Sequence, residues 1–269
     1  ELKIACTSES SASVERLATM LATNGYGRIV IVGGDSALNR ALNGIMSVGM
    51  DVELATIPYG FANDFARYWG YDEDEYKRSI DWIIGGRTRL VDVGYVEQGG
   101  LQCRYFLNCV NVGLASDLMA IQRTSRKWGV MRYFYRSLMI LFRRKERVMK
   151  LKVNHDVINR RVMNVCVGSC RGYGQTPNAV PYSGLLDVCV LNHPGLKQLG
   201  EGLWLLASGR FLNCKQSEAH RTRNYVAIDD TGGAKVSLDG LMWNDYNGEA
   251  FGIGLLPERV KFVIPPSNY

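Results

Sequence analysis

The first ninety residues alternate between helical and strand-like patterns of hydrophobic positions. Apolar residues recur at helical spacing over residues 13–23, and an unbroken β-branched run follows at 29–32. A second apolar helical pattern begins at Ser36, and another strand-like run occupies residues 52–57. Such an alternation is typical of a parallel sheet with helices on both faces. The other elements predicted here are a short strand at 3–6, a helix from Asn63 and a helix at 75–84.

The pattern changes after Asp92, where strand-like runs dominate. Helical spacing is restricted to residues 121–150 and 196–208, so we expect a mainly antiparallel β domain in this part of the chain. Strands are predicted at 105–112, 149–153, 157–167, 186–191, 225–228, 235–238, 250–255 and 260–264.

The two textures predict an α/β fold class with two domains. Residues 1–92 form an N-terminal three-layer, Rossmann-like domain with a parallel sheet, and residues 93–258 form a C-terminal β-sandwich domain. The last strand, within 259–269, is expected to return to the first domain.

Positive charge is concentrated in one segment, residues 121–150. Ten Lys and Arg and one acid give this segment +9, so the rest of the chain carries −3 of the net +6. Trp128, Phe134 and Leu138 share one helical face, and the basic residues share the other. This is an amphipathic helix with a solvated charged face, or one that makes peripheral contact with an anionic membrane. No nucleic-acid-binding motif accompanies the charge, so no nucleic-acid partner is expected.

Overall composition excludes several other classes. Hydrophobic residues make up 46% and charged residues 22%, as in globular proteins rather than disordered ones. No run of about 18 apolar residues is present to span a membrane. The seven Cys include no CxxC pair, which favours buried free thiols in a reducing cytoplasm over a disulfide framework or zinc site. We therefore expect a cytoplasmic location, with membrane contact at the inner face.

Two strand-to-helix turns carry the candidate chemistry. The first strand runs into Gly33-Gly34-Asp35 at the start of a helix, where backbone N–H groups favour an anion such as phosphate. The second turn, which includes Gly60, Asn63 and Asp64, has the same design. Asp35, Asp64 and Asp92 each follow or end a strand. Because ligands bind at the carboxyl ends of parallel strands, these three acids suggest a Mg²⁺ site there.

Four segments of the chain carry recognisable motifs: GGDSALNRALNG at 33–44, PYGFANDFAR at 58–67, YSGLLDVCVL at 182–191 and VSLDG at 236–240. Together they resemble the diacylglycerol kinase catalytic domain family, which includes sphingosine kinases and bacterial lipid kinases. The family usually reads GGDGTxNEVxNG, PxGTxNDFAR, DDGLLDV and DGE at these four places. No segment of the given sequence resembles the family's first strand with its NPxSG-like loop.

The resemblance implies an ATP-dependent lipid kinase with a nucleotide-binding domain over 1–92 and a lipid-substrate domain over 93–258. It implies that Asp239 is the general base that accepts the proton of the lipid hydroxyl. Nucleotide-binding roles are implied for Gly33, Gly34, Asp35, Asn39, Gly60, Asn63 and Asp64, and magnesium-binding roles for Asp35, Asp64 and Asp92.

Several positions depart from the family's usual residues. Phe61 replaces a threonine near the phosphates, Ser183 replaces an aspartate of a structural Mg²⁺ site, and Leu241 replaces a glutamate. In the first motif, Ser36 and Ala37 replace Gly and Thr, and Arg40 replaces an acid.

Three interpretations stay open at this stage. The chain is a working kinase for diacylglycerol or a related lipid, a catalytically degenerate lipid- or nucleotide-binding module, or a relative of the NAD kinases. An exposed strand edge in either domain would allow a homodimer.

Overall fold

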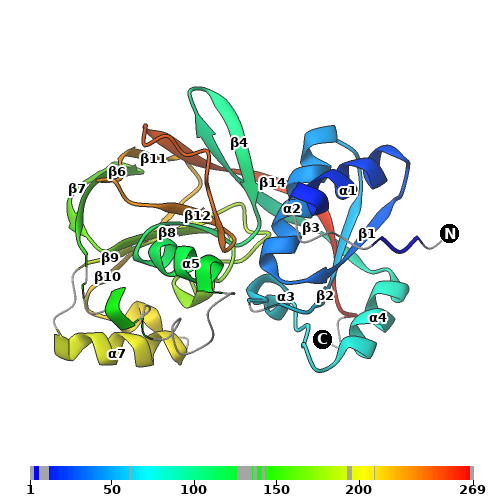
Figure 1. Ribbon diagram of the computed structural model, residues 1–269, viewed down its shortest axis with the longest axis horizontal. Coiled ribbons are helices and arrows are strands. Elements are labelled where there is room, and N and C mark those ends of the chain that lie inside the picture. Colours follow the sequence, from blue (N-terminus) through cyan, green and yellow to red (C-terminus); the bar gives the residue numbers. More distant parts are fainter. Residues whose placement is uncertain are drawn as a thin grey trace.

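The strands form two sheets, and helices cover the N-terminal part of the first (Figure 1). In the described residues, one sheet has eight strands, with the path β1-β2-β14-β11-β6-β7 and with β3 and β4 joined to it through β14. The other has six strands in the order β10-β9-β8-β5-β12-β13. The computed structural model describes residues 3–5, 12–60, 62–125, 135, 138–140, 143, 145–192, 196–208 and 210–266.

The N-terminal domain has three layers. β1 (Arg28–Gly33), β2 (Glu53–Pro58) and the C-terminal half of β14 (Phe251–Val263) run parallel. Neighbouring residues on a strand point to opposite faces. Accordingly, Leu54 is part of the core cluster that includes residues of α1 and α2, whereas Ala55 packs with Ile83 of α4. The helices of this domain are α1 (Ala12–Thr23), α2 (Asp35–Val48), α3 (Asp64–Tyr68) and α4 (Tyr76–Gly85).

The C-terminal domain is a β-sandwich. Its main apolar cluster has contributions from both sheets, including Val110 and Val165 from one and Leu151 and Ile253 from the other. The strands of this domain are β4 (Leu101–Phe106), β5 (Cys109–Gly113), β6 (Arg147–Val153), β7 (Asp156–Val162), β8 (Asn164–Gly168), β9 (Leu186–Leu191), β10 (Ser217–Thr222), β11 (Val226–Asp230), β12 (Val236–Leu238) and β13 (Leu241–Met242). Its helices are α5 (Leu114–Ser125) and α7 (Leu196–Ala207).

Two long strands belong to both domains. β3 (Thr88–Gln98) pairs with β14 from Val263 to Gly252, and the pairing is interrupted by a bulge between Leu256 and Val260. Asp92 lies opposite this bulge and is fully buried. Its Oδ1 accepts from the N–H of Glu258 (2.9 Å), and its Oδ2 accepts from the N–H of Gly184 (2.7 Å). The Asp92 carboxylate thus fastens the bulge and a loop of the sandwich at the point where the shared strands pass between the domains.

The α/β class with a parallel N-terminal sheet and a C-terminal β-sandwich is confirmed. Two long predicted strands were wrong, because each is two strands. The predicted strand 105–112 divides at Leu107-Asn108, and the predicted strand 157–167 divides at Met163, where the chain crosses from one sheet to the other. Conversely, the predicted strands 250–255 and 260–264 are one bulged strand, β14. Polar β10 was missed because its sequence, SEAHRT, lacks an apolar alternation.

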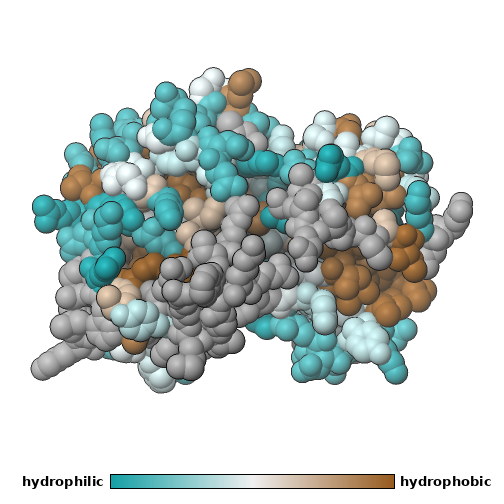
Figure 2. Space-filling model, viewed as in Figure 1, coloured by the Kyte–Doolittle hydropathy of each residue, from teal (hydrophilic) through white to brown (hydrophobic). Residues whose placement is uncertain are grey.

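The predicted strand at 3–6 was also wrong for the residues described there. Residues 3–5 have no regular secondary structure, and Ile4 is 83% exposed. A strand requires a neighbour for its hydrogen bonds, and β1 is the last strand on this side of the sheet. Figure 2 shows apolar side chains gathered on this side of the N-terminal domain, where Val30 and Val32 of β1 are exposed. Cys6 lies outside the described residues.

The helix predicted at 121–150 is confirmed at the described residues 121–125, 135, 138–140 and 143. The prediction was wrong from Arg147 onward, where β6 begins and pairs with β7 throughout. The other residues between 125 and 145 lie outside the described residues. Among the described residues, no helix has both the length and the apolarity to cross a bilayer. Five cysteines are buried free thiols: Cys109, Cys166, Cys170, Cys189 and Cys214.

Replacing Asp92 by alanine should destabilise the whole protein. Two buried N–H groups would lose their acceptor, and each such loss costs about 1–3 kcal/mol, so the free energy of unfolding should fall by roughly 2–6 kcal/mol. Urea denaturation followed by tryptophan fluorescence measures this change. Asp51→Ala is the control, because Asp51 is exposed and bonds only the exposed Lys261, so its effect should stay within about 0.5 kcal/mol. Equal effects of the two substitutions would contradict the role given to Asp92.

Candidate functional site

The two glycine turns that follow β1 and β2 pack directly against each other. A Cβ on Gly60 would lie 2.4 Å from the Cα of Gly34, and a Cβ on Gly34 would lie 2.6 Å from the carbonyl oxygen of Ala62. The N–H of Asp35 donates to that same Ala62 oxygen at 2.9 Å. Glycine is therefore required at positions 34 and 60 because the two turns approach each other closely. This close approach brings the starts of α2 and α3 together. Phe61 lies outside the described residues.

Asp35 links the two helices at their N-termini. Although it is the first residue of α2, its carboxylate accepts from the N–H groups of Asp64 (3.0 Å) and Phe65 (3.2 Å) at the start of α3. Burial first, and then the nearby carboxylates of Asp239 and Asp64, raise the pKa of Asp35 to about 8, although the two N–H bonds oppose this rise. Asp35 thus marks the place where three acidic side chains influence one another.

Asn63 and Asp64 contribute oxygen atoms that have no hydrogen-bond partner. The amide of Asn63 donates to the carbonyl of Gly60 at 2.9 Å, but its Oδ1 is buried and unpartnered. The Oδ2 of Asp64 is also buried and unpartnered. Burial raises the pKa of Asp64, and the Arg67 charge opposes that rise. Unpaired buried oxygens are costly, so both are candidates to contact a bound cation or a ligand donor.

Asp239 approaches this cluster from the sandwich domain, at the turn between β12 and β13. Its backbone is left-handed, with φ 45°. Its carboxylate accepts four hydrogen bonds. Three come from the N–H groups of Leu107 (2.8 Å), Asn108 (2.9 Å) and Cys109 (2.9 Å), and the fourth comes from the side chain of Asn39 on α2 at 2.9 Å. Burial raises the pKa of Asp239, and these hydrogen bonds oppose the rise. Four donors occupy the acceptor capacity of a carboxylate.

Tyr173 and Asn108 also belong to the site, although the sequence did not indicate them. The hydroxyl of Tyr173 is buried and unpartnered, and the side chain of Asn108 is close enough to Asp64 to lower the pKa of that acid. Burial, and next the Asp35 charge, raise the pKa of Tyr173 well above its ordinary value. The Oδ1 of Asn108 accepts from the N–H of Gly172 at 2.8 Å, which holds the Tyr173 turn in place. The one signal in the sequence is that Tyr173 stands between two glycines, Gly172 and Gly174. In the structure both glycines have positive φ.

Asp92 is not part of this hydrogen-bonded cluster. Its oxygens bond Glu258 and Gly184, as described above, so the structure brings Asp35 and Asp64 together but not Asp92. Ser183, which replaces an aspartate of the family, bonds the carbonyl of Val180 at 2.8 Å. Within the described part of the chain, no group of three or more His, Cys, Asp or Glu side chains is arranged to hold a metal ion. The three-acid Mg²⁺ site stays a prediction.

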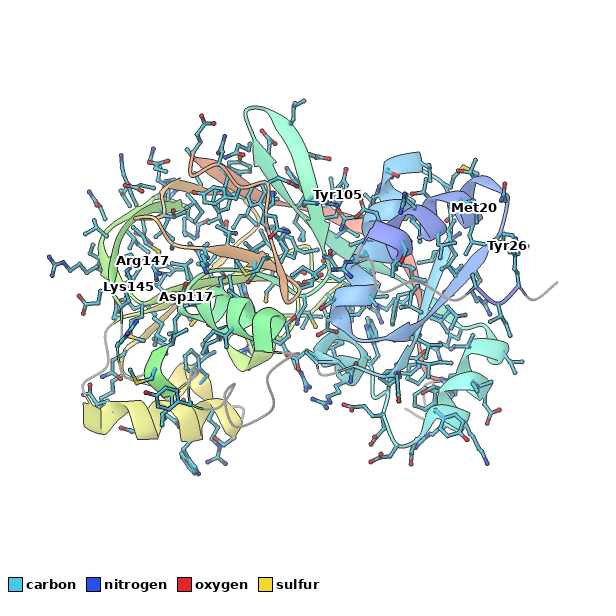
Figure 3. The ribbon with its side chains drawn as sticks, in the orientation of Figure 1. Met20, Tyr26, Tyr105, Asp117, Lys145 and Arg147 are labelled. Carbon is cyan, nitrogen blue, oxygen red and sulfur yellow. The ribbon has the colours of Figure 1, made fainter. Side chains whose placement is uncertain are left out.

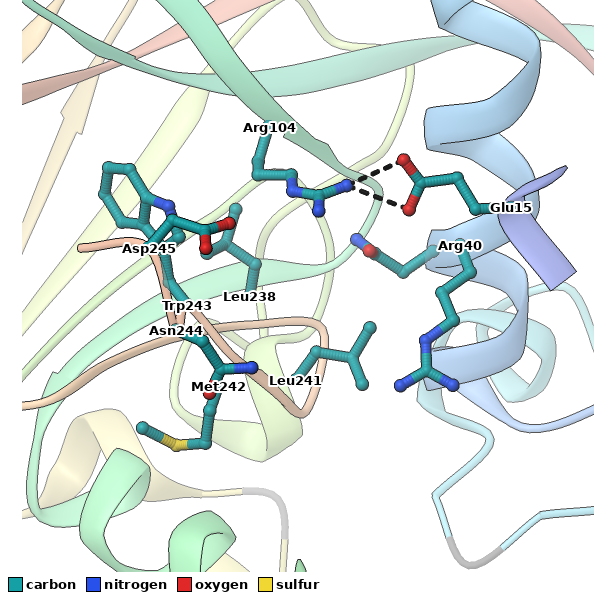
Figure 4. A pocket seen from close by; sticks show the side chains of 10 residues that line it. Glu15, Arg40, Arg104, Leu238, Leu241, Met242, Trp243, Asn244 and Asp245 are labelled. Carbon is teal, nitrogen blue, oxygen red and sulfur yellow. Dashed lines mark hydrogen bonds and ion pairs between the residues drawn. The ribbon is translucent and has the colours of Figure 1, made fainter. Parts of the chain in front are cut away.

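A pocket of about 160 Å³ lies beside this cluster, between α1, α2, β4 and the turn after β12. Asn39 lines it, as do Arg40 and Leu241, two of the positions that depart from the family (Figure 4). Arg104 of β4 forms two 2.9 Å hydrogen bonds with the carboxylate of Glu15 on α1, which ties the two domains together at the pocket rim. The pocket is thus polar on the α2 side and apolar near Leu241.

Comparison with known proteins agrees with the fold. The diacylglycerol kinase catalytic domain family matches residues 2–96, and the YegS C-terminal NAD kinase beta sandwich-like domain family matches residues 108–263. Together they cover both domains. The chain therefore belongs to the diacylglycerol kinase and YegS-like lipid kinase family.

Individual relatives are distant but cover most of the chain. A diacylglycerol kinase of Bacillus subtilis is 22% identical over 79% of this chain and 70% of its own length. A probable lipid kinase YegS-like of Shewanella frigidimarina is 25% identical over 96% of this chain and 82% of its own length. The crystal structure of a putative diacylglycerol kinase from Bacillus anthracis has the same fold, with a TM-score of 0.73 and 19% identity over 96% of this chain and 85% of that one.

The raised pKa of Asp35 makes a specific prediction about stability and pH. An acid with a higher pKa in the folded state holds more protons there than in the unfolded chain, so stability falls as pH rises between about 4 and 8. The slope from this one group is at most about 1.4 kcal/mol per pH unit. In Asp35→Asn, this contribution to the slope of unfolding free energy against pH should disappear. Urea denaturation at pH 5, 6 and 7 tests this, with Asp51→Asn as the control, and identical slopes for Asp35→Asn and wild type would contradict it.

Proposed function

We propose that this protein transfers the γ-phosphate of ATP to the hydroxyl group of a lipid, with Mg²⁺ as the bound cation. The observation that carries the proposal is the cluster of Asp35, Asp64 and Asp239 surrounded by unpartnered buried polar atoms. A buried acidic cluster is unfavourable on its own, and a cation held by Asp64 and Asn63 would relieve both the charge repulsion and the missing contacts of their oxygens.

The residues present fit a magnesium ion. Mg²⁺ prefers oxygen ligands and needs only one or two carboxylates when phosphate and water supply the rest. Asp64 and Asn63 each offer an unpartnered oxygen, and Asp35 lies within electrostatic reach of Asp64. When bound, the ion would neutralise charge that develops on the transferred phosphoryl group. It would also favour the ionised form of Asp35, whose pKa is raised in its absence.

The nucleotide site is assigned to the two glycine turns and the adjoining pocket. Gly33, Gly34 and Gly60 allow the turns to lie close together at the N-termini of α2 and α3, where phosphate is favoured. Arg40 and Asn39 of α2 line the pocket next to them, so Arg40 supplies a cationic group where the family usually has an acid.

Asp239 is the candidate general base, and its hydrogen bonds define what this role requires. A fully occupied carboxylate accepts a proton from a lipid hydroxyl only after one of its donors has moved. The Asn39 bond is the one that comes from α2 in the other domain. A shift of α2 away from the β12–β13 turn would therefore free one acceptor position on Oδ2 while the three backbone N–H bonds, one of them also to Oδ2, keep the carboxylate in position.

The acceptor is proposed to be diacylglycerol or a related lipid alcohol, from the family and from the names of the relatives. A specific observation favours the alternative of a catalytically degenerate binding module. Asp239 is saturated by hydrogen bonds, and Leu241 stands two residues later where the family usually has a glutamate. A degenerate module would bind lipid or nucleotide without transferring phosphate, so turnover separates the two interpretations.

The decisive test is transfer of radiolabelled phosphate from ATP to dioleoylglycerol in mixed micelles, with the product resolved by thin-layer chromatography. We expect turnover for the wild type and a loss of at least about 100-fold for Asp64→Asn, because loss of one positioning charge in phosphoryl transfer costs about 3 kcal/mol or more. Asp51→Asn is the charge-matched control and should retain full activity.

Two outcomes would contradict the proposal. No transfer to dioleoylglycerol, sphingosine or undecaprenol by a protein that binds Mg-ATP would establish the degenerate module instead. Equal activity of Asp64→Asn and wild type would show that the acidic cluster is not the site of phosphoryl transfer.

A further inference from the structure

A second cluster of charge lies in the sandwich domain, outside the site described above. Arg147, the first residue of β6, is only 7% exposed. One nitrogen of its guanidinium group bonds Asp117 of α5 at 2.8 Å, but Nε and Nη1 are buried and have no hydrogen-bond partner. Arginine stays charged in proteins, so this is a buried cation with donors left over.

Arg147 lines a cavity of about 460 Å³ together with three more cations, Arg143, Lys145 and Lys235. The one acid in its lining is Asp117, which is already paired with Arg147. Figure 3 shows Lys145, Arg147 and Asp117 near one another beside α5, at the end of the sandwich far from the N-terminal domain. The cavity therefore has a strong excess of positive charge and hydrogen-bond donors.

Part of the wall of this cavity is apolar. It is built from Ala120 and Ile121 of α5 and from Ile140. A small anion such as chloride would leave this wall without a contact. A phosphate group attached to a hydrocarbon-bearing group would satisfy both sides, because the phosphate accepts from the cations while the apolar part covers the wall.

We propose that this cavity binds the phosphate group of an amphiphilic ligand, such as an anionic phospholipid headgroup. The guanidinium of Arg147 supplies the buried donors at the base of the site, and Lys145 and Lys235 supply exposed charge at its entrance. The site is independent of the acidic cluster, so it does not depend on the protein being an active kinase.

Isothermal titration with dihexanoyl phosphatidic acid tests the proposal, with dihexanoylglycerol and inorganic phosphate as separate probes. Lys145→Ala/Lys235→Ala removes two cations from the lining. Neither side chain is buried, so the fold should be retained. Lys215→Ala/Arg223→Ala is the matched control, because both residues are exposed and neither lines this cavity. Asp64→Asn keeps the proposed site intact while altering the kinase site.

We expect phosphatidic acid to bind, and the Lys145→Ala/Lys235→Ala variant should weaken its binding at least tenfold. The control variant and Asp64→Asn should not change the binding of phosphatidic acid. Dihexanoylglycerol lacks the phosphate, so any binding of it at the kinase site should be the same in the Lys145→Ala/Lys235→Ala variant and the wild type. If inorganic phosphate also binds, and the Lys145→Ala/Lys235→Ala variant weakens its binding by the same factor, the phosphate site is supported. The affinity of the cavity for phosphate would then come from the cations alone. Absence of binding by either phosphate-containing probe, or equal loss in the control variant, would overturn the proposal.

Discussion

The site depends on the four hydrogen bonds that converge on the Asp239 carboxylate. Three of them hold the Leu107–Cys109 segment, where the chain passes from β4 in one sheet to β5 in the other, and the fourth reaches α2 in the N-terminal domain. One buried acid thus fixes a sheet crossover and a domain contact at once. Such a group is stable only while its donors are present, because an unpaired charge in this position would be strongly unfavourable.

Asp92 performs a similar task at the other connection between the domains. β3 and β14 run through both domains, so any relative movement must bend these strands at the β14 bulge that Asp92 holds. A bulge bends and twists a strand locally, which suits a joint between two rigid units. The structure therefore has a joint at Asp92, and hydrogen bonds from Asn39 and Asn43 of α2 to Asp239 and Tyr105 join the domains near the acidic cluster.

The sequence predicted the elements whose hydrophobic pattern is local, and it failed where long-range contacts decide. β1, α2 and β2 follow directly from their apolar spacing. The breaks at Leu107-Asn108 and Met163 interrupt continuous strand-like patterns. At these breaks the N–H of Leu107 donates to Asp239 and the N–H of Met163 donates to Leu191, and both acceptors are distant in the sequence. The residues of the glycine turns were predicted as site residues from their motifs. The packing of the two turns against each other, the hydrogen bonds of Asp92 and the position of Tyr173 could not be predicted, because they arise only in the folded chain.

The central claim is that the acidic cluster holds a nucleotide through a divalent cation, and calorimetric titration of ATP tests it most directly. The account predicts that the wild type binds ATP in the presence of Mg²⁺, and that EDTA or the substitution Asp64→Asn weakens binding at least tenfold, which is about 1.4 kcal/mol. Asp51→Asn should bind as the wild type does. ATP affinity that is unaffected by both EDTA and Asp64→Asn, or no binding at millimolar ATP, would contradict the account.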